Sequence, residues 1–144
     1  RRVYSYSIHR KPNVFMLDGQ PNVVVKLPTG DLEVTAARQL AAMGGPAFLA
    51  DVTVSDGTRA YLLDFIPDAI TVKMSGTQLV FETPGENEAM RLRVMQERIT
   101  PAVLAQIQDY FVRIMKLGYL PMDFQVLLDA HGRVYPFDPG AYAT

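Results

Sequence analysis

The segment of residues 120–141 constrains the fold of this chain more than any other stretch. It reads LPMDFQVLLDAHGRVYPFDPGA, and its two apolar runs on either side of a glycine-containing turn predict a β-hairpin. Asp123 precedes the first run and Asp138 follows the second. The outer ends of two antiparallel strands lie side by side. We therefore expect the hairpin to hold both carboxylates close together over one pocket.

Strand patterns fill most of the first half of the chain, and turn residues separate them. β-Branched residues run up to Lys26, Asp56-Gly57 is a tight-turn pair, and apolar positions at helical spacing follow Asp31. The predicted elements are strands over residues 1–8, 14–17 and 22–27, a helix that Asp31 caps and Gly44 ends, and a hairpin of residues 51–55 and 58–65.

Helix signals are concentrated in the second half. Thr100-Pro101 is a typical helix start, and apolar residues recur at helical spacing from there to Gly118. Before it, residues 70–81 predict a short strand pair, and a capping-box pattern over residues 83–86 opens another helix. We expect one α+β domain over residues 1–144, with a β-rich lobe and hinge in residues 1–68 and a reduced helical lobe in residues 69–144.

Composition excludes several classes of function. A formal net charge of −1 argues against a globally basic nucleic-acid binder, and the absence of cysteine removes disulfides, thiol nucleophiles and thiolate metal sites. No apolar run approaches the roughly 18 residues of a membrane span, and no signal-peptide pattern is present. We expect a cytoplasmic protein, or one that is secreted or injected into a target cell as part of a larger protein.

Several motifs, taken in order, give the chain a resemblance to the protein-kinase fold reduced to a minimum. Val23-Val24-Val25-Lys26 has the form of the V-A-I-K pattern at the end of the third kinase strand, and Glu33 is the only glutamate of the predicted helix that follows. Residues 61–68, YLLDFIPD, look like the fifth strand and the hinge. Asp138-Pro139-Gly140 stands where kinases carry D-F-G.

The resemblance implies a site for ATP and Mg²⁺. Lys26 would neutralise the phosphates while Glu33 holds its ammonium, and Asp138 and Gln125 would bind Mg²⁺. Asp123 would accept or orient the proton of the acceptor hydroxyl. The chain has no glycine-rich loop, so serine hydroxyls, the basic side chains of residues 9–11 or backbone amides would cover the phosphates, and the hinge would grip the adenine ring. The residues implied for these contacts are Ser5, Ser7, Leu63, Asp64, Phe65 and Ile66.

The departures from the kinase pattern define the kind of kinase that we expect. The usual catalytic loop places its asparagine five residues after the aspartate, whereas Asp123 stands two residues before Gln125. An Asp-x-Gln followed by Asp-Pro is similar to the α-kinase pattern and to small kinase-like effectors and toxin domains of bacteria. The implied activity is that of an atypical minimal protein kinase. Its substrate would be a target-cell protein with a hydroxyl acceptor, and a cognate immunity protein would be a further partner.

Two other functions stay open at this stage. The shifted aspartate and the missing glycine loop also fit a kinase-like binding module without catalysis. A toxin domain that acts on RNA could use the basic residues Arg1, Arg2, Arg10 and Lys11. The motifs also have ordinary structural explanations, namely Lys26 as a charged guard of an edge strand, Gln125 as a solvent-facing residue and Asp123 as a loop carboxylate.

Overall fold

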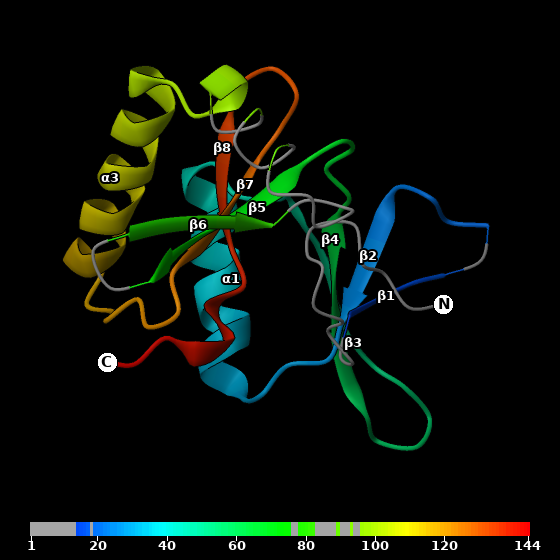
Figure 1. The fold of residues 1–144 in the computed structure, drawn as a ribbon. Helices are drawn as coiled ribbons and strands as arrows, with labels where there is room; N and C mark the ends of the chain where they lie inside the picture. Colours follow the sequence, from blue (N-terminus) through cyan, green and yellow to red (C-terminus); the bar gives the residue numbers. More distant parts are fainter. Residues whose placement is uncertain (1–13, 18, 76–77, 83–88, 90–92, 94–95) are drawn as a thin grey trace.

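The described part of the chain has an α+β fold with two antiparallel four-stranded sheets and helices packed beside them (Figure 1). The computed structural model describes residues 14–17, 19–75, 78–82, 89, 93 and 96–144. The first sheet is made from the front of the chain, and the second sheet combines a central strand pair with the closing hairpin. This arrangement confirms the predicted α+β class.

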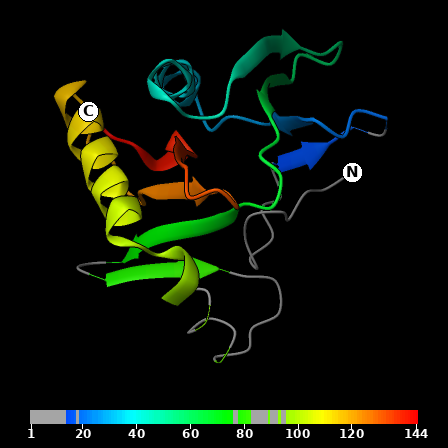
Figure 2. The ribbon, with the colours of Figure 1, turned by 90° about the horizontal axis from the view of Figure 1, so that it is seen from above.

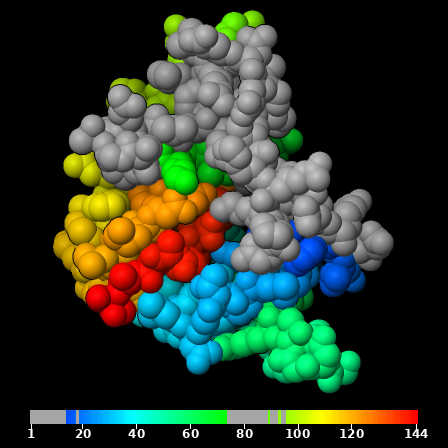
Figure 3. All heavy atoms as spheres, turned by 60° about the horizontal axis from the view of Figure 1, so that its bottom comes forward, coloured from blue at the N-terminus to red at the C-terminus, as the bar shows by residue number. Residues whose placement is uncertain are grey.

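The first sheet has the strand order β1-β2-β4-β3. Its strands are β1 (Val14–Met16), β2 (Val23–Lys26), β3 (Phe48–Thr53) and β4 (Arg59–Asp64), and all neighbours are antiparallel. β2 lies between β1 and β4, and its run of valines suits a strand that is paired on both sides. The exposed loop of residues 54–58, between β3 and β4, projects from the body of the molecule (Figure 3).

The second sheet has the strand order β6-β5-β7-β8. Its strands are β5 (Ile70–Ser75), β6 (Gln78–Glu82), β7 (Gln125–Leu128) and β8 (Val134–Phe137). The helix α3 (Pro101–Lys116) covers this sheet with its buried residues Val103, Ile107 and Ile114. Figure 2 shows α3 along one side of the second sheet and the first sheet on the other side.

The helix α1 (Asp31–Met43) is shared by two hydrophobic cores. Ala36 and Leu40 belong to the larger core, which contains residues of β5, β7, β8 and α3. Val34 and Ala37 form a smaller core with Tyr61 of β4. The segment that follows β8 lies against α1 in Figures 1 and 3, and it includes the short helix η1 (Pro139–Ala141). The ends of β2 and β8 are therefore brought together beside α1.

Most predicted elements within the described residues are confirmed. The strands before α1, the helix α1 itself, the strand pair after residue 69, the helix α3 and the closing hairpin all lie where expected. Thr100 caps α3, because its hydroxyl accepts a hydrogen bond from the Val103 N–H at 3.2 Å. The predicted strand over residues 1–8 and the capping box over residues 83–86 lie outside the described residues. In the described part of the chain, no helix is long and apolar enough to cross a membrane.

Two expectations about the elements need correction. Asp31 does not cap α1, because Gly30 is the N-cap residue and the Asp31 carboxylate pairs with Arg59 instead. The second half, predicted as a helical lobe, contains a four-stranded sheet as well as α3. The reason is that β5 pairs with β7, so the central strand pair and the closing hairpin merge into one sheet.

Candidate functional site

Lys26 is a buried cation on an inner strand, with 5% of its surface exposed. Side chains alternate along a strand, so Lys26 shares the inward face of β2 with buried Val24. β2 pairs with β1 on one side and with β4 on the other. The explanation of Lys26 as the guard of an edge strand is therefore wrong. A buried ammonium group needs carboxylate partners, and Lys26 has two.

The first partner of Lys26 is Glu33, in the first turn of α1. Its Oε2 lies 3.0 Å from Lys26 Nζ and accepts a hydrogen bond from the Tyr61 hydroxyl at 2.5 Å. Its Oε1 accepts from the backbone N–H and the hydroxyl of Thr29 at 3.0 and 3.1 Å. Burial raises the pKa of the Glu33 carboxyl, but the Lys26 charge and the bonds from Tyr61 and Thr29 outweigh it and hold this pKa below its usual value.

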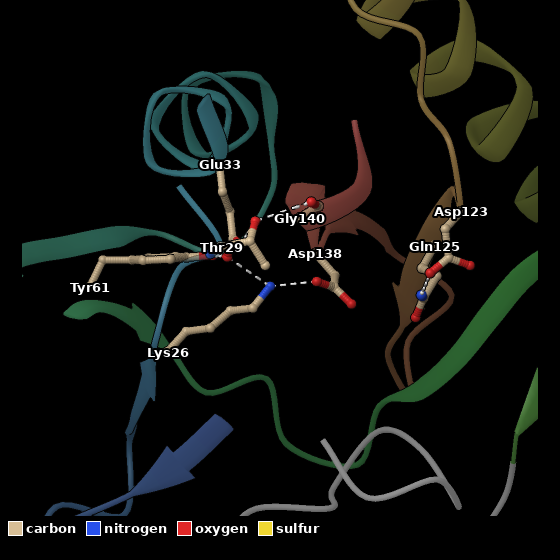
Figure 4. A network of polar contacts seen from close by, with 8 residues as sticks. All are labelled: Lys26, Thr29, Glu33, Tyr61, Asp123, Gln125, Asp138 and Gly140. Carbon is tan, nitrogen blue, oxygen red and sulfur yellow. Dashed lines mark hydrogen bonds and ion pairs between the residues drawn. The ribbon is translucent and has the colours of Figure 1, made fainter. Parts of the chain in front are cut away.

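The second partner of Lys26 is Asp138, directly after β8. The two side chains form an ion pair (Figure 4). The Asp138 backbone is left-handed, with φ 57° and ψ 63°, a conformation that aspartate adopts more readily than most residues. Its carboxylate and Glu33 thus hold Lys26 from two sides. Lys26 joins three elements that are far apart in the sequence, namely β2, α1 and the segment after β8.

Gly140 allows the segment after β8 to approach Glu33 closely. The Thr29 hydroxyl, whose single proton is shared with Glu33 Oε1, also lies 3.2 Å from the Gly140 carbonyl oxygen. A Cβ atom on Gly140 would lie 2.9 Å from Glu33 Oε1 and 3.7 Å from Asp138 Oδ1. A larger residue in place of Gly140 would therefore force the Glu33 carboxylate or the backbone to shift.

Asp123 and Gln125 form a second group, and the Asp138 side chain lies between this group and Lys26 in Figure 4. Gln125 opens β7, is 4% exposed and donates from Nε2 to Asp123 Oδ2 at 2.9 Å. Lys73 of β5 places its Nζ 2.8 Å from Asp123 Oδ1. The explanation of Gln125 as a solvent-facing residue is therefore wrong. Because Gln125 is opposite Phe137, Asp123 and Asp138 flank the hairpin at the same end, and their common pocket stays a prediction.

Two of the backbone N–H groups of the predicted hinge are already hydrogen-bonded within the protein. Leu63 and Asp64 end β4, and Phe65 and Ile66 follow as half-buried residues. The Asp64 and Phe65 N–H groups donate to backbone carbonyls of the protein, each at 3.0 Å. An adenine ring would have to displace those bonds or use other groups. Ser5 and Ser7 lie outside the described residues.

Several residues of the site carry no motif in the sequence. Thr29 and Tyr61 bond to Glu33, and Lys73 pairs with Asp123. Tyr142 is 5% exposed, and its hydroxyl has no hydrogen-bond partner among the described residues. Burial and the nearby Asp138 charge raise the pKa of Tyr142. The signal that could have pointed to Lys73 is a lone charge inside the strand ITVKMS.

The oxygen donors of the site are of the kind that could hold Mg²⁺ only together with other ligands. Among the described residues, no three His, Asp or Glu side chains gather closely enough to hold a metal by themselves. Mg²⁺ commonly takes one or two carboxylates and completes its shell with water and substrate phosphates. Asp138 supplies a carboxylate and Gln125 an amide oxygen, which are both oxygen donors of the kind that Mg²⁺ prefers.

A cavity of about 370 Å³ lies at the opposite end of the closing hairpin. Its lining includes Asp129, His131 and Arg98, and none of the predicted site residues. Asp129 has a structural role there, because its Oδ1 accepts from the backbone N–H groups of His131 and Arg133, both at 2.9 Å. This cavity is separate from the site around Lys26.

Comparisons with protein-family models, with curated proteins and with solved structures found no match for this chain. The function therefore has to be inferred from the arrangement around Lys26 and from the motifs that supply it.

Proposed function

We propose that the protein is an ATP- and Mg²⁺-dependent phosphotransferase of an atypical, minimal protein-kinase type. The observation that carries the proposal is the buried Lys26, whose ammonium joins Glu33 of α1 to Asp138 after β8. In protein kinases a strand lysine pairs with a glutamate of the next helix, and the aspartate of D-F-G holds Mg²⁺. The same residue types meet here from elements in the same order.

The connectivity of the first sheet supports a kinase-like first lobe. α1 lies between β2, which carries Lys26, and the β3–β4 hairpin, and β4 returns to pair with β2. In that pairing Lys26 is opposite Tyr61, and Val23 is opposite Asp64. Lys26 and the hinge position are thus three residues, or roughly 10 Å, apart along the strands. A nucleotide that lies along β4 could therefore place its base at the hinge position and its phosphates at Lys26.

The proposed chemistry uses the residues of the two sheets in separate roles. Lys26, held by Glu33, would bind oxygens of the α- and β-phosphates, and Asp138 and Gln125 would hold Mg²⁺. Bound Mg²⁺ would neutralise part of the phosphate charge. The acceptor oxygen bonds to the γ-phosphorus, its proton passes to Asp123, and the bond to the bridging oxygen breaks so that ADP leaves with that electron pair. The acceptor that we propose is a hydroxyl group of a protein substrate.

One observation favours a second candidate, a nucleotide-binding module without transfer activity. Both oxygens of Asp123 are engaged, one by Lys73 and one by Gln125. A carboxylate held in this way is less available to accept a proton. In this candidate function Lys26 still binds the phosphates of a nucleotide, but no phosphoryl group is transferred.

Label transfer from γ-labelled ATP tests the proposal. The protein is incubated with labelled ATP, Mg²⁺ and a cell lysate, beside the variants Lys26→Met and Asp138→Asn. We expect the wild type to label a protein band and each variant to lose at least about 100-fold of that rate, because each removes a charged contact to the reacting phosphates. Lys116→Met, at the exposed end of α3, is the matched control and should keep wild-type activity.

The outcomes distinguish the candidates. Unchanged labelling by Asp138→Asn would contradict the proposed metal role. A wild type that shows a thermal shift with Mg²⁺ and ATP but transfers no label would favour the binding module. Degradation of RNA without ATP would favour the RNA-directed alternative, whose basic residues lie outside the described part of the chain.

A further inference from the structure

We propose that Lys73 is a second phosphate-binding residue of this site and contacts the terminal phosphate of the bound nucleotide. This inference rests on the proposed function and adds a residue that no motif supplies. β5 pairs with β7 so that Lys73 is opposite Gln125, and β7 pairs with β8 so that Gln125 is opposite Phe137. Directly paired residues share one face of a sheet. Lys73 therefore lies beside Gln125, Phe137 ends the same row, and Asp138 is the next residue along the chain after Phe137.

The contact with Asp123 places the Lys73 ammonium at the reacting atoms. Lys73 Nζ lies 2.8 Å from Asp123 Oδ1, while Gln125 occupies Oδ2. Asp123 is the proposed acceptor of the hydroxyl proton. In a reactive complex the hydroxyl oxygen approaches the γ-phosphorus to about 3–3.5 Å. A cation that touches the same carboxylate is therefore within reach of the γ-phosphate oxygens.

The two lysines of the site differ in accessibility. The Lys26 side chain is 6% exposed and pairs with two carboxylates, whereas the Lys73 side chain is 40% exposed. Lys26 comes from the first sheet and Lys73 from the second. The buried lysine suits the α- and β-phosphates, which stay with the nucleotide. The accessible lysine suits the phosphoryl group that is transferred.

The charge balance of the site gives Lys73 a physical role. Its ion pairs combine Lys26 and Lys73 with three carboxylates, those of Glu33, Asp123 and Asp138. Among the described residues, these five groups carry a net negative charge before a triphosphate enters. During transfer, negative charge is spread over the phosphoryl oxygens, and a cation that is already in place stabilises it. Lys73 would offset the negative charge of Asp123 beside the phosphoryl group that is transferred.

A purely structural role for Lys73 makes a different prediction. The Lys73–Asp123 pair would then be a half-exposed ion pair, and such pairs contribute little to stability. Its loss would change the binding of nucleoside diphosphate and triphosphate equally. The preference for a triphosphate is therefore the quantity that separates the two roles.

The test measures dissociation constants by calorimetry for Mg²⁺-ADP and for Mg²⁺ with a non-hydrolysable imido analogue of ATP. We expect Lys73→Met to reduce the preference for the triphosphate analogue by roughly 10- to 100-fold, the size of one lost charge-assisted bond, with ADP affinity unchanged within about twofold. Lys73→Arg should retain part of the preference, and Lys116→Met should retain all of it. Asp123→Asn should slow label transfer but keep or raise the preference, because it removes a negative charge beside the terminal phosphate.

Two results would overturn the inference alone. The first is a Lys73→Met variant that keeps the full preference while Lys26→Met loses affinity for both nucleotides. The second is an Asp123→Asn variant that loses the preference as Lys73→Met does, because Lys73 would then act through Asp123. A wild type that binds neither nucleotide contradicts the proposed function itself, and the inference with it.

Discussion

One buried carboxylate organises the site at the scale of single residues. Glu33 accepts hydrogen bonds from Thr29 and Tyr61 and pairs with Lys26, and it is 2% exposed. A buried charge with several donors is stable, but removing it leaves each donor without its partner. Substitutions at Glu33 are therefore expected to affect stability and Lys26 together.

Glu33→Gln should weaken the fold at neutral pH and reduce its sensitivity to acid. The folded pKa of Glu33 lies below its usual value of 4.5, so on acidification the unfolded chain takes up this proton first. The contribution of Glu33 is complete above that usual value and is lost as the pH falls through the lower folded pKa. Urea unfolding of the wild type and the variant at about pH 7 and about pH 3 measures this contribution to the free energy of unfolding. We expect Glu33→Gln to lower the free energy of unfolding by roughly 3 kcal/mol at neutral pH and by less in acid.

Glu97 offers a matched control for that measurement, because its side chain is exposed. Glu97→Gln should leave both the stability and its pH dependence close to those of the wild type. Equal acid sensitivity of the wild type and Glu33→Gln would contradict the assignment of the lowered pKa to Glu33.

At the scale of elements, the site depends on how closely the segment after β8 approaches α1. Gly140 lies against the Glu33 carboxylate, and Thr29, just before α1, contacts the Gly140 carbonyl. Because Gly140 touches Glu33 and Thr29 also bonds to Glu33, a shift of the segment after β8 would displace the Glu33 carboxylate. The position of η1 relative to α1 therefore sets the geometry around Lys26.

Gly140→Ala should disrupt the site without adding or removing a charge. The new methyl group would lie 2.9 Å from Glu33 Oε1, so the carboxylate or the backbone of η1 must move. We expect a loss of about 1–3 kcal/mol of stability, as for overpacking, and a fall in nucleotide binding. Chemical denaturation and calorimetry measure the two effects. Gly30→Ala is the control, because nothing lies within 4 Å of its added Cβ, and it should bind nucleotide as the wild type does.

The sequence predicts those parts of the fold and site that depend on local patterns. The apolar spacing after Thr100 predicts α3, and the motifs identify Lys26, Glu33 and Asp138. The pairing of β5 with β7 is a long-range contact with no local signal, so the second sheet was not foreseen. The error at Asp31 arises because Arg59 competes for its carboxylate. Tyr61 and Lys73 were missed because their roles depend on strand register.

At the scale of the whole molecule, α1 joins the two cores into one structure. Leu40 contributes to the core of the second sheet, and Val34 and Ala37 contribute to that of the first. The Lys26–Asp138 pair adds a charged contact between the two parts. Neither sheet can keep its core complete if α1 unfolds.

The two sheets should therefore unfold in a single transition. The chain has no tryptophan, so Phe48→Trp and Phe111→Trp can each report on one part by fluorescence. We expect equal urea midpoints for the two probes. Leu40→Ala should lower both midpoints together, because it should reduce the free energy of unfolding by about 2–5 kcal/mol. Two separate midpoints, or a Leu40→Ala effect on Phe111→Trp alone, would contradict this expectation.

The shared position of α1 also has a consequence for synthesis on the ribosome. The nascent chain delivers α1 well before the core of Ala36 and Leu40 can be completed, because β7 and β8, which also belong to this core, emerge about 90 residues later. Until then the core that Ala36 and Leu40 join is incomplete. At typical translation rates of about 5–20 residues per second, this interval lasts several seconds. During that time the newly made first half is the stage of the protein most open to aggregation or to capture by a chaperone.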